Sequence, residues 1–291
     1  MPVIIRNKAK NITEVSNLQE FFAYLASDKP RKPRVNFFRG HALQSYVLQP
    51  SLFRKKEYRR DEKNIVRELI SIQPNEFRDD RTMFEQLVRM QHFSLPTRLL
   101  DVTYNPLVAL YFTCVHHQNQ DGDLIRLSAN QTEIKYFDSD TVSCVANLAN
   151  LSGKQRDAIR RMSGSDELVV SDVGERLLHF IQAEKPYFRP RIQINDLKDI
   201  IVVKPKQTNR RILAQQGAFL IFGLKTILHE ENDFAIDIRK VKIPASAKKH
   251  ILSELDGINI NSSTLFPEIE SAAKYIMSKI IPVEDGFEQL E

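Results

Sequence analysis

Apolar residues recur at helical spacing in several parts of the chain. Residues three and four apart share one face of a helix, so such spacing predicts an amphipathic helix. In the first half, helices are predicted at 16–25 with Ser16 as N-cap, at 61–73 ending before Pro74, at 81–91, and at 105–117 with Asn105 as cap and Pro106 at the first position. The last of these is apolar on most sides, which indicates a buried helix.

Shorter runs, apolar or alternating, predict strands. They lie at 34–40, 122–128, 199–205, 217–223 and 234–244, with a further short buried strand inside 95–103. The run at 217–223 is apolar almost throughout, as expected of a central strand. Residues 141–183 read as helical up to Pro186, and two more helical segments are expected at 244–255 and 267–280. Since strands and helices do not alternate regularly, the pattern predicts an α+β fold with a mixed central sheet and flanking helices.

The composition indicates which class of protein this is. The chain has 291 residues, of which 42% are hydrophobic and 27% charged, values typical of a globular protein. No run approaches the ~20 apolar residues of a membrane helix, and the first ten residues lack the order of a signal peptide. The two cysteines, Cys114 and Cys144, form no C-x-x-C pair and fit small core residues in a reducing cytoplasm.

The net charge is +5, and basic residues cluster at 31–34 and 54–60. Such clusters are compatible with a polyanion partner, and equally with a solvated face.

Phe37-Phe38-Arg39-Gly40 ends the first predicted strand. A guanidinium offers a fixed fork of donors that suits phosphate or carboxylate, and glycine permits close approach of a backbone or a ligand. Arg39 therefore points to an anion site; an ion pair with a carboxylate such as Asp101 is the alternative.

Polar residues at the end of a strand and before a helix N-terminus form a natural anion pocket. Segment 95–103 has this position, and its polar members are Thr97, Arg98, Asp101 and Thr103. His92, just upstream, is a candidate switchable donor, or a helix-end histidine bonded locally. Gln215 and Gln216 precede the central strand, where an amide could orient a ligand hydroxyl or simply bond to the backbone.

Other chemistries have less support. The chain has no phosphate loop, dinucleotide fingerprint, nucleophile elbow or H-E-x-x-H motif. His116 and His117 are neighbours on a helix and make a poor metal pair, so no metal site is predicted. Glu133-Ile134-Lys135 following Asp123 resembles a metal-dependent nuclease core, which leaves a nuclease as an alternative.

Four segments in this order resemble the FRG-domain family: FFRG, QHFSLPTRLLDVTYNPLVALYF, RRILAQQGAFLIF, and DGINI followed by TLFPEIE. The resemblance covers most of the chain and implies an FRG domain over 30–291, preceded by a helical segment over 1–29. Members of this family occur near phage-defence and mobile-element genes. The resemblance by itself implies no single activity.

A more distant resemblance is to ADP-ribosyltransferases, whose first strand ends in Tyr-Arg-Gly or Phe-Arg-Gly. In that superfamily the arginine contacts the phosphates of NAD, and Arg39 with Gly40 matches this position. Asp101-Val102-Thr103, followed by Ala109 to Phe112, resembles its second strand end and helix. Gln215-Gln216-Gly217 stands where the superfamily has a Glu-x-Glu or Gln-x-Glu loop. The implied fold is an ADP-ribosyltransferase-like core.

The resemblance implies that Arg39 binds the pyrophosphate, that Thr103 and Asp101 shape the nicotinamide-ribose pocket, and that Gln215 orients the ribose. Gln216, His92, Thr97 and Arg98 are secondary candidates. The usual catalytic glutamate is absent, and a neutral glutamine stabilises an oxocarbenium-like transition state less.

The leading hypothesis is a cytoplasmic enzyme that transfers ADP-ribose from NAD to a macromolecule as a toxin or antiviral effector. Nucleic acid is the target class that the positive charge favours, and an antitoxin or phage protein is an expected partner; a membrane is not. The nuclease and a non-catalytic module that senses a nucleotide or a phage protein remain the alternatives.

Overall fold

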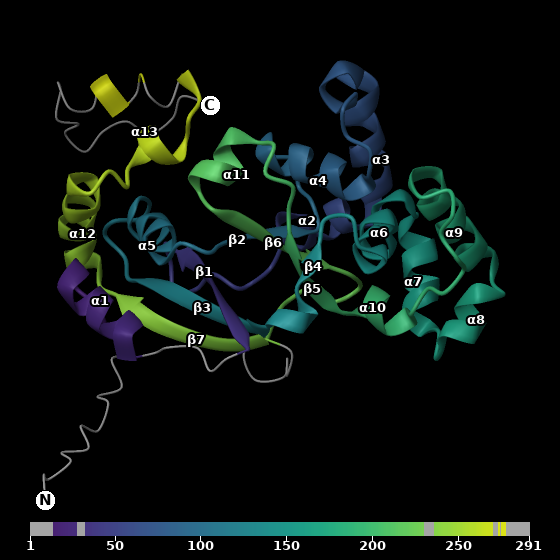
Figure 1. Cartoon of the computed structure of the whole chain (residues 1–291), viewed down its shortest axis with the longest axis horizontal. Coiled ribbons are helices and arrows are strands. Elements are labelled where there is room, and N and C mark those ends of the chain that lie inside the picture. The colour runs from purple at the N-terminus through teal and green to yellow at the C-terminus, as the bar shows by residue number, and fades with distance from the viewer. Residues whose placement is uncertain (1–13, 28–32, 230–235, 270–272, 274, 278–291) are drawn as a thin grey trace, which may run out of the picture.

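A seven-stranded sheet runs through the centre of the computed structural model, which describes residues 14–27, 33–229, 236–269, 273 and 275–277 (Figure 1). The strands are β1 (Arg34–His41), β2 (Leu99–Thr103), β3 (Gly122–Asn130), β4 (Lys135–Tyr136), β5 (Ile200–Lys204), β6 (Gly217–Phe222) and β7 (Ile236–Ile243). Their order is β4-β5-β6-β2-β1-β3-β7. β4 and β5 are parallel and the other neighbours are antiparallel, so the predicted α+β class and mixed sheet are confirmed.

The helices are α1 (Leu18–Ser27), α2 (Ser51–Arg54), α3 (Lys56–Ile72), α4 (Met83–His92), α5 (Pro106–Cys114), α6 (Asp140–Ala146), α7 (Gly153–Arg161), α8 (Ser165–Val169), α9 (Asp172–Glu184), α10 (Ile194–Lys198), α11 (Arg210–Ala214), α12 (Ala245–Gly257) and α13 (Ser262–Leu265). Three short 3-10 turns are η1 (Pro74–Phe77), η2 (Gln131–Glu133) and η3 (Asn147–Asn150). No helix in the described part of the chain is long and apolar enough to cross a membrane.

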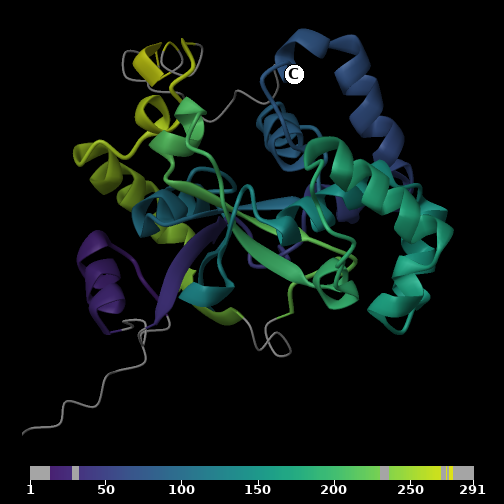
Figure 2. The same cartoon turned by 45° about the vertical axis from the view of Figure 1, so that its right-hand side comes forward.

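Two groups of helices cover one face of the sheet. A core cluster joins α1, α5 and α12 to β1, β3 and β7. A second cluster joins α3, α4 and α6 to α10 to the neighbouring strands β2, β5 and β6. Figures 1 and 2 show this second group gathered at the other end of the sheet.

The alternation of side chains along the strands places both clusters on the same face. Phe38 of the first cluster pairs with Thr103, which alternates in phase with Leu99 of the second. Leu100 and Val102 point the other way, into a third cluster on the opposite face. The two helical groups therefore meet above the contact between β1 and β2.

The predicted strands are present at the expected places, although residues 234 and 235 of the last run lie outside the described residues. β6 is central and buried on both faces, as its apolar run predicts. Asn105 caps α5 by accepting a hydrogen bond from the Leu107 N–H at 2.9 Å, with Pro106 in the first turn. The expected burial of α5 is also confirmed, since six of its residues are buried.

Helix ends differ from the prediction in two places where a cap explains the difference, and a third prediction is not tested. The segment 141–183 is broken into α6 to α9, because Ser152 and Ser171 each cap a new helix. Asn17, rather than Ser16, caps α1 by accepting a hydrogen bond from the Glu20 N–H at 2.9 Å. The helix expected at 267–280 falls largely outside the described residues.

Candidate functional site

A cavity of about 360 Å³ opens where β1 and β2 separate, between the two helical groups. In the described structure, the ladder between these strands holds one pair of facing residues, Phe38 and Thr103. All five residues of β2 pair instead with β6 on its other side. Strands that part in this way leave backbone groups without a ladder partner, which must be satisfied by other donors or by a ligand.

Arg39 fills part of this gap. Its Nη1 donates to the backbone carbonyl of Asp101 at 2.6 Å, so the guanidinium replaces a strand partner. Its Nε donates to Nε2 of His41 at 3.4 Å. No ion pair joins Arg39 to the Asp101 carboxylate, so that alternative is not what the structure has, and Oδ2 of this carboxylate accepts from Nε2 of Gln91 at 2.8 Å.

No carboxylate of the described residues lies within ion-pair distance of Arg39. Burial lowers the pKa of Arg39, and the nearby charge of Arg54 lowers it further, while the charge of Asp101 opposes both effects. A desolvated cation without a paired anion is costly. A bound anion at this end of the cavity would offset that cost.

The cavity as a whole is positive. Arg54 and Arg211 also line it, and the Arg211 guanidinium lies 4.8 Å from the ring centre of Phe266. Among the described residues that line the cavity, Asp101 is the sole acid. Three guanidiniums against one carboxylate favour an anionic ligand.

Two of the histidines that line the cavity, His41 and His92, add no further charge. Burial lowers the pKa of His41 to about 3, with contributions from Arg39 and Lys240. Because Nε2 of His41 accepts a hydrogen bond from Arg39, that nitrogen carries no proton. Burial and the charge of Arg211 also lower the pKa of His92, against a smaller opposing effect of Glu268. His41 and His92 are therefore neutral near pH 7 and can act as hydrogen-bonding groups.

Six of the residues predicted from the sequence meet at this cavity: Arg39, Gly40, His92, Asp101, Thr103 and Gln215. Thr103 Oγ1 donates to the backbone carbonyl of Gln215 at 2.6 Å and so ties β2 to the loop before β6. The Gln215 amide donates to the carbonyl of Leu265 at 3.0 Å. Gln215 therefore joins the cavity wall to the C-terminal segment.

Gly40 permits the close approach of a backbone, which is one of the two roles that the sequence left open for it. A Cβ at this position would lie 2.2 Å from the carbonyl oxygen of Ala109 and 2.6 Å from the backbone nitrogen of Thr113. The close approach that glycine permits is therefore that of helix α5 onto β1.

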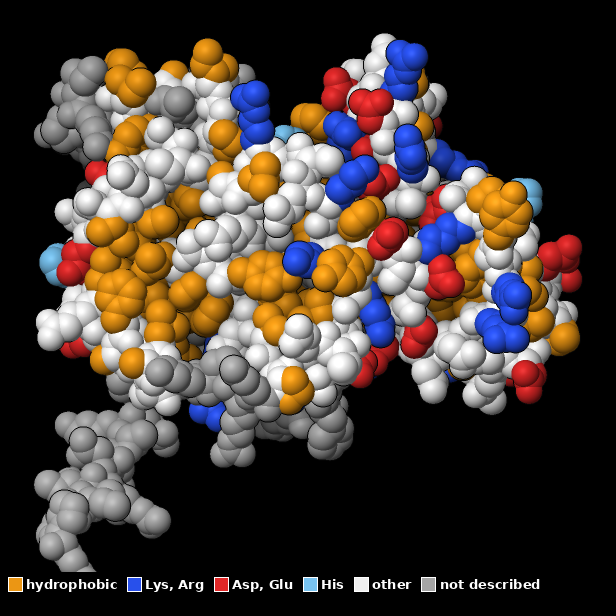
Figure 3. Space-filling model, in the orientation of Figure 1, with side chains coloured by type: hydrophobic (Ala, Val, Ile, Leu, Met, Phe, Trp, Pro, Cys, Tyr) orange, Lys and Arg blue, Asp and Glu red, His pale blue; other side chains and the backbone are white. Residues whose placement is uncertain are grey.

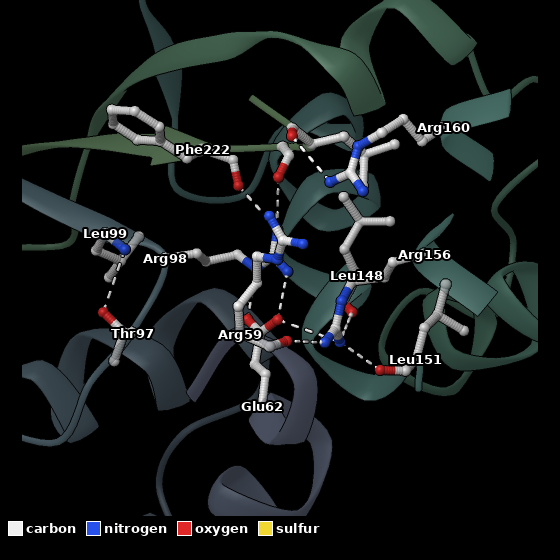
Figure 4. Close-up of polar contacts among 12 residues, drawn as sticks. Arg59, Glu62, Thr97, Arg98, Leu99, Leu148, Leu151, Arg156, Arg160 and Phe222 are labelled. Atoms are coloured by element: carbon white, nitrogen blue, oxygen red, sulfur yellow. Dashed lines mark hydrogen bonds and ion pairs between the residues drawn. The ribbon is translucent and has the colours of Figure 1, made fainter. Parts of the chain in front are cut away.

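Arg98 is not brought to the cavity, and Figure 4 shows why. Its side chain is 1% exposed and donates to both carboxylate oxygens of Glu62, at 2.8 and 2.6 Å. The carbonyls of Phe222 and Gly223 take further N–H groups, and Arg156 reaches the same Glu62 at 3.2 Å. Arg98 is a buried structural residue whose donors are used by the protein itself.

Thr97 and Gln216 also lie outside the cavity lining. Thr97 is 1% exposed, and its hydroxyl donates to Oε1 of Gln91 at 2.5 Å. Gln216 is exposed and has a positive φ of 47°, which makes the turn into β6. Of the two glutamines, only Gln215 lines the cavity.

Sequence reasoning missed Gln91, His41, Arg54 and Arg211 as lining residues. Arg54 is the first residue of the basic run at 54–60, whose composition was equally compatible with a solvent-exposed surface. Gln91 lies within the segment that carries the family resemblance, yet a polar residue on a helix shows no partner in the sequence. His41 lies two residues after Arg39 on β1 and therefore shares its face of the sheet, which the sequence could have indicated. Gln91, Arg54 and Arg211 reach the cavity through tertiary contacts.

The surface near α3 does not form a uniform basic patch. Lys55, Lys56 and Arg60 are exposed, but Glu57 and Asp61 lie among them. Figure 3 shows basic and acidic side chains mixed over this helix. Of the basic residues at 54–60, only Arg54 lines the cavity and adds positive charge to it.

The residues of the nuclease alternative do not meet. Asp123 is the second residue of β3 and Glu133 follows the end of that strand, so the strand separates them by about 20 Å or more. The described residues contain no group of three or more histidine, cysteine or acidic side chains that could hold a metal ion. This arrangement gives no support to a metal-dependent nuclease core.

Comparison with known proteins identifies one part of the chain. The family model of the FRG domain matches residues 34–122, which run from β1 through β2 and α5 to the first residue of β3. No curated protein and no solved structure matches the chain.

Proposed function

Since this chain contains an FRG domain, with β1, β2 and α5 of the cavity inside the matched region, we propose that it is an NAD-dependent ADP-ribosyltransferase. The proposal includes an ADP-ribosyltransferase-like core built on β1, β2 and β6. ADP-ribose would pass from NAD to a macromolecule.

One observation carries the proposal: the guanidinium of Arg39 faces the cavity and has no carboxylate partner among the described residues. A pyrophosphate supplies the missing negative charge and accepts the remaining N–H groups. Arg54 adds a second cation to the same cavity.

The other residues take roles around that anchor. Asp101 and Thr103 shape the nicotinamide-ribose pocket, and Gln215 contacts the ribose from the wall that it shares with Leu265. His92, neutral near pH 7, is a secondary hydrogen-bonding group. Thr97, Arg98 and Gln216 have no direct role in ligand binding in this proposal.

The biological setting is also proposed. The protein acts in the cytoplasm as a toxin or antiviral effector, with an antitoxin or a phage protein as partner. The net charge of +5 favours nucleic acid as the acceptor of ADP-ribose.

The test uses labelled NAD, cell lysate and the variant Arg39→Ala. We expect the wild type to label one macromolecular fraction, and Arg39→Ala to lose transfer and to weaken NAD binding by at least about 30-fold, since a buried charged contact contributes about 2 kcal/mol or more. Isothermal titration gives the affinity, and separation of protein, RNA and DNA identifies the acceptor.

Arg161→Ala is the matched control, because Arg161 is an exposed arginine on α7 and lies outside the cavity lining. It removes the same charge and should leave NAD affinity unchanged. Equal affinity for NAD in wild type and Arg39→Ala would refute the assignment.

A second candidate function is a module that binds a nucleotide without turnover. It is favoured by the glutamine at position 215, whose amide is engaged with Leu265. It predicts that NAD binds with the same dependence on Arg39 and is recovered intact, which mass spectrometry of the incubated NAD detects.

A further inference from the structure

A chain of hydrogen bonds fixes the one acid in the cavity lining. It begins at the backbone N–H of Leu99, which donates to Oγ1 of Thr97 at 3.2 Å. Thr97 Oγ1 then donates to Oε1 of Gln91 at 2.5 Å, and Nε2 of Gln91 donates to Oδ2 of Asp101 at 2.8 Å. The chain thus runs from the buried start of β2 to the cavity.

The direction of each bond is determined. Because the Thr97 hydroxyl already accepts from a backbone N–H, its own proton is available for Gln91. A carboxylate only accepts hydrogen bonds, so the nitrogen of Gln91 faces Asp101 and its oxygen faces Thr97, whose hydroxyl donates to it. Asp101 is held by one oxygen, and no hydrogen bond from the described residues reaches Oδ1.

The position of Asp101 is suited to chemistry. Its side chain is exposed, lines the cavity and lies on the sheet face where the two helical groups meet. Its backbone carbonyl accepts from Arg39, the proposed pyrophosphate anchor, and the charge of its carboxylate raises the pKa of that guanidinium. No other acid of the described residues lines this cavity.

We propose that Asp101 is the catalytic base of the site and that Gln91 and Thr97 are positioning residues that act through it. This inference rests on the proposed function. The acceptor group, written X–H, attacks C1′ of the nicotinamide ribose. The X–C1′ bond forms as the C1′–N bond breaks, nicotinamide leaves with the electron pair, and the proton of X–H goes to Asp101.

With water as the acceptor the same step yields ADP-ribose and nicotinamide, so consumption of NAD reports on it without a known target. A base that is positioned within reach of the nucleophile accelerates such a step by about 100-fold or more. Thr97 is buried and cannot reach a ligand, so its effect on turnover would be transmitted through Gln91.

The experiment compares Asp101→Asn, Thr97→Val and Thr97→Ser with the wild type for NAD turnover, NAD affinity and thermal unfolding. Asp101→Asn keeps the size of the side chain in the pocket wall, so it should lower kcat at least about 100-fold and change NAD affinity by a much smaller factor. Thr97→Val keeps the shape and loses the hydroxyl, so it should lower kcat about tenfold or more with little change in KM. Thr97→Ser keeps the hydroxyl and should restore turnover.

Glu133→Gln is the carboxylate control, since Glu133 is exposed beyond the far end of β3. Its turnover should equal that of the wild type. Wild-type turnover in Asp101→Asn, or a loss in Thr97→Ser equal to that in Thr97→Val, would overturn this inference and leave the NAD site standing. A wild type that binds NAD without consuming it would also overturn it. A wild type that does not bind NAD would overturn the proposed function as well.

Discussion

Two arginines in the motif segments show how strongly the fate of a residue depends on its surroundings. Arg98 meets Glu62 and two backbone carbonyls, so its charge is neutralised inside the protein. Arg39 meets a carbonyl and a neutral histidine, so its charge remains to be balanced. Both arginines lie near an end of a strand, but only Arg39 faces the cavity.

The Arg98 network gives a prediction about stability. Glu62→Gln keeps the shape but leaves two buried arginines, Arg98 and Arg156, without their carboxylate. Loss of one partner from a buried ion pair costs about 3–5 kcal/mol, so we expect a fall of that size in the free energy of unfolding. Urea denaturation measures it.

An exposed ion pair supplies the comparison. Asp157→Asn removes the partner of Arg160, where both side chains are more than a third exposed. Surface pairs contribute about 0–1 kcal/mol. Similar losses of stability in the two variants would contradict the role assigned to Glu62.

At the level of elements, Gly40 fixes how closely α5 packs on β1. In Gly40→Ala the new methyl would meet the carbonyl of Ala109 at 2.2 Å, and because that atom belongs to the backbone, the helix itself must move. Overpacking of this kind costs about 1–3 kcal/mol, so we expect a lower thermal midpoint and weaker NAD binding at the displaced cavity wall.

Gly257→Ala is the matched control. Gly257 ends α12, and a Cβ there would meet nothing within 4 Å. Its thermal midpoint should stay the same or rise slightly, because alanine favours a helix. An unchanged midpoint in Gly40→Ala would show that α5 does not need the glycine.

Element type follows from local patterns, and element boundaries depend on competing caps. The apolar run of β6 and the Asn-Pro start of α5 are encoded within a few residues, and both were predicted. The break between α6 and α7 was not, because Ser152 forms a capping box with Gln155 inside a segment of continuous helical periodicity. A serine in such a segment is compatible with either outcome until its surroundings are known.

Only part of the candidate site could be predicted from the sequence, because nonlocal strand pairing brings some of its residues together. Arg39 and Asp101 each occupy a strand end in a recognisable motif, and the structure places both at the cavity. Arg211 and Gln91 reach the same cavity from helices remote in sequence, through the order β6-β2-β1 in the sheet. That order is set by nonlocal strand pairing, which no local pattern specifies.

The sheet order also bears on the region that the family model matches, residues 34–122. That region contains β1 and β2 but only the first residue of β3, and it lacks β6. β1 would lose its neighbour β3, and β2 would lose β6, with which all five of its residues pair. The partners of α4 in α6 and η3 would also be missing. Expressed alone, the segment would expose unpaired strand edges and half of a core.

We therefore expect residues 34–122 to lack a cooperative unfolding transition and to aggregate, whereas the whole chain unfolds cooperatively. Circular dichroism during thermal unfolding, with the full chain as the reference, distinguishes the two. A folded fragment with dispersed amide resonances would mean that β1 and β2 find their structure without β3 and β6. In that case the separation of β1 and β2 would belong to the matched region alone. If the fragment is unfolded, the cavity is a property of the entire sheet, since its walls depend on strands more than 80 residues apart in the chain.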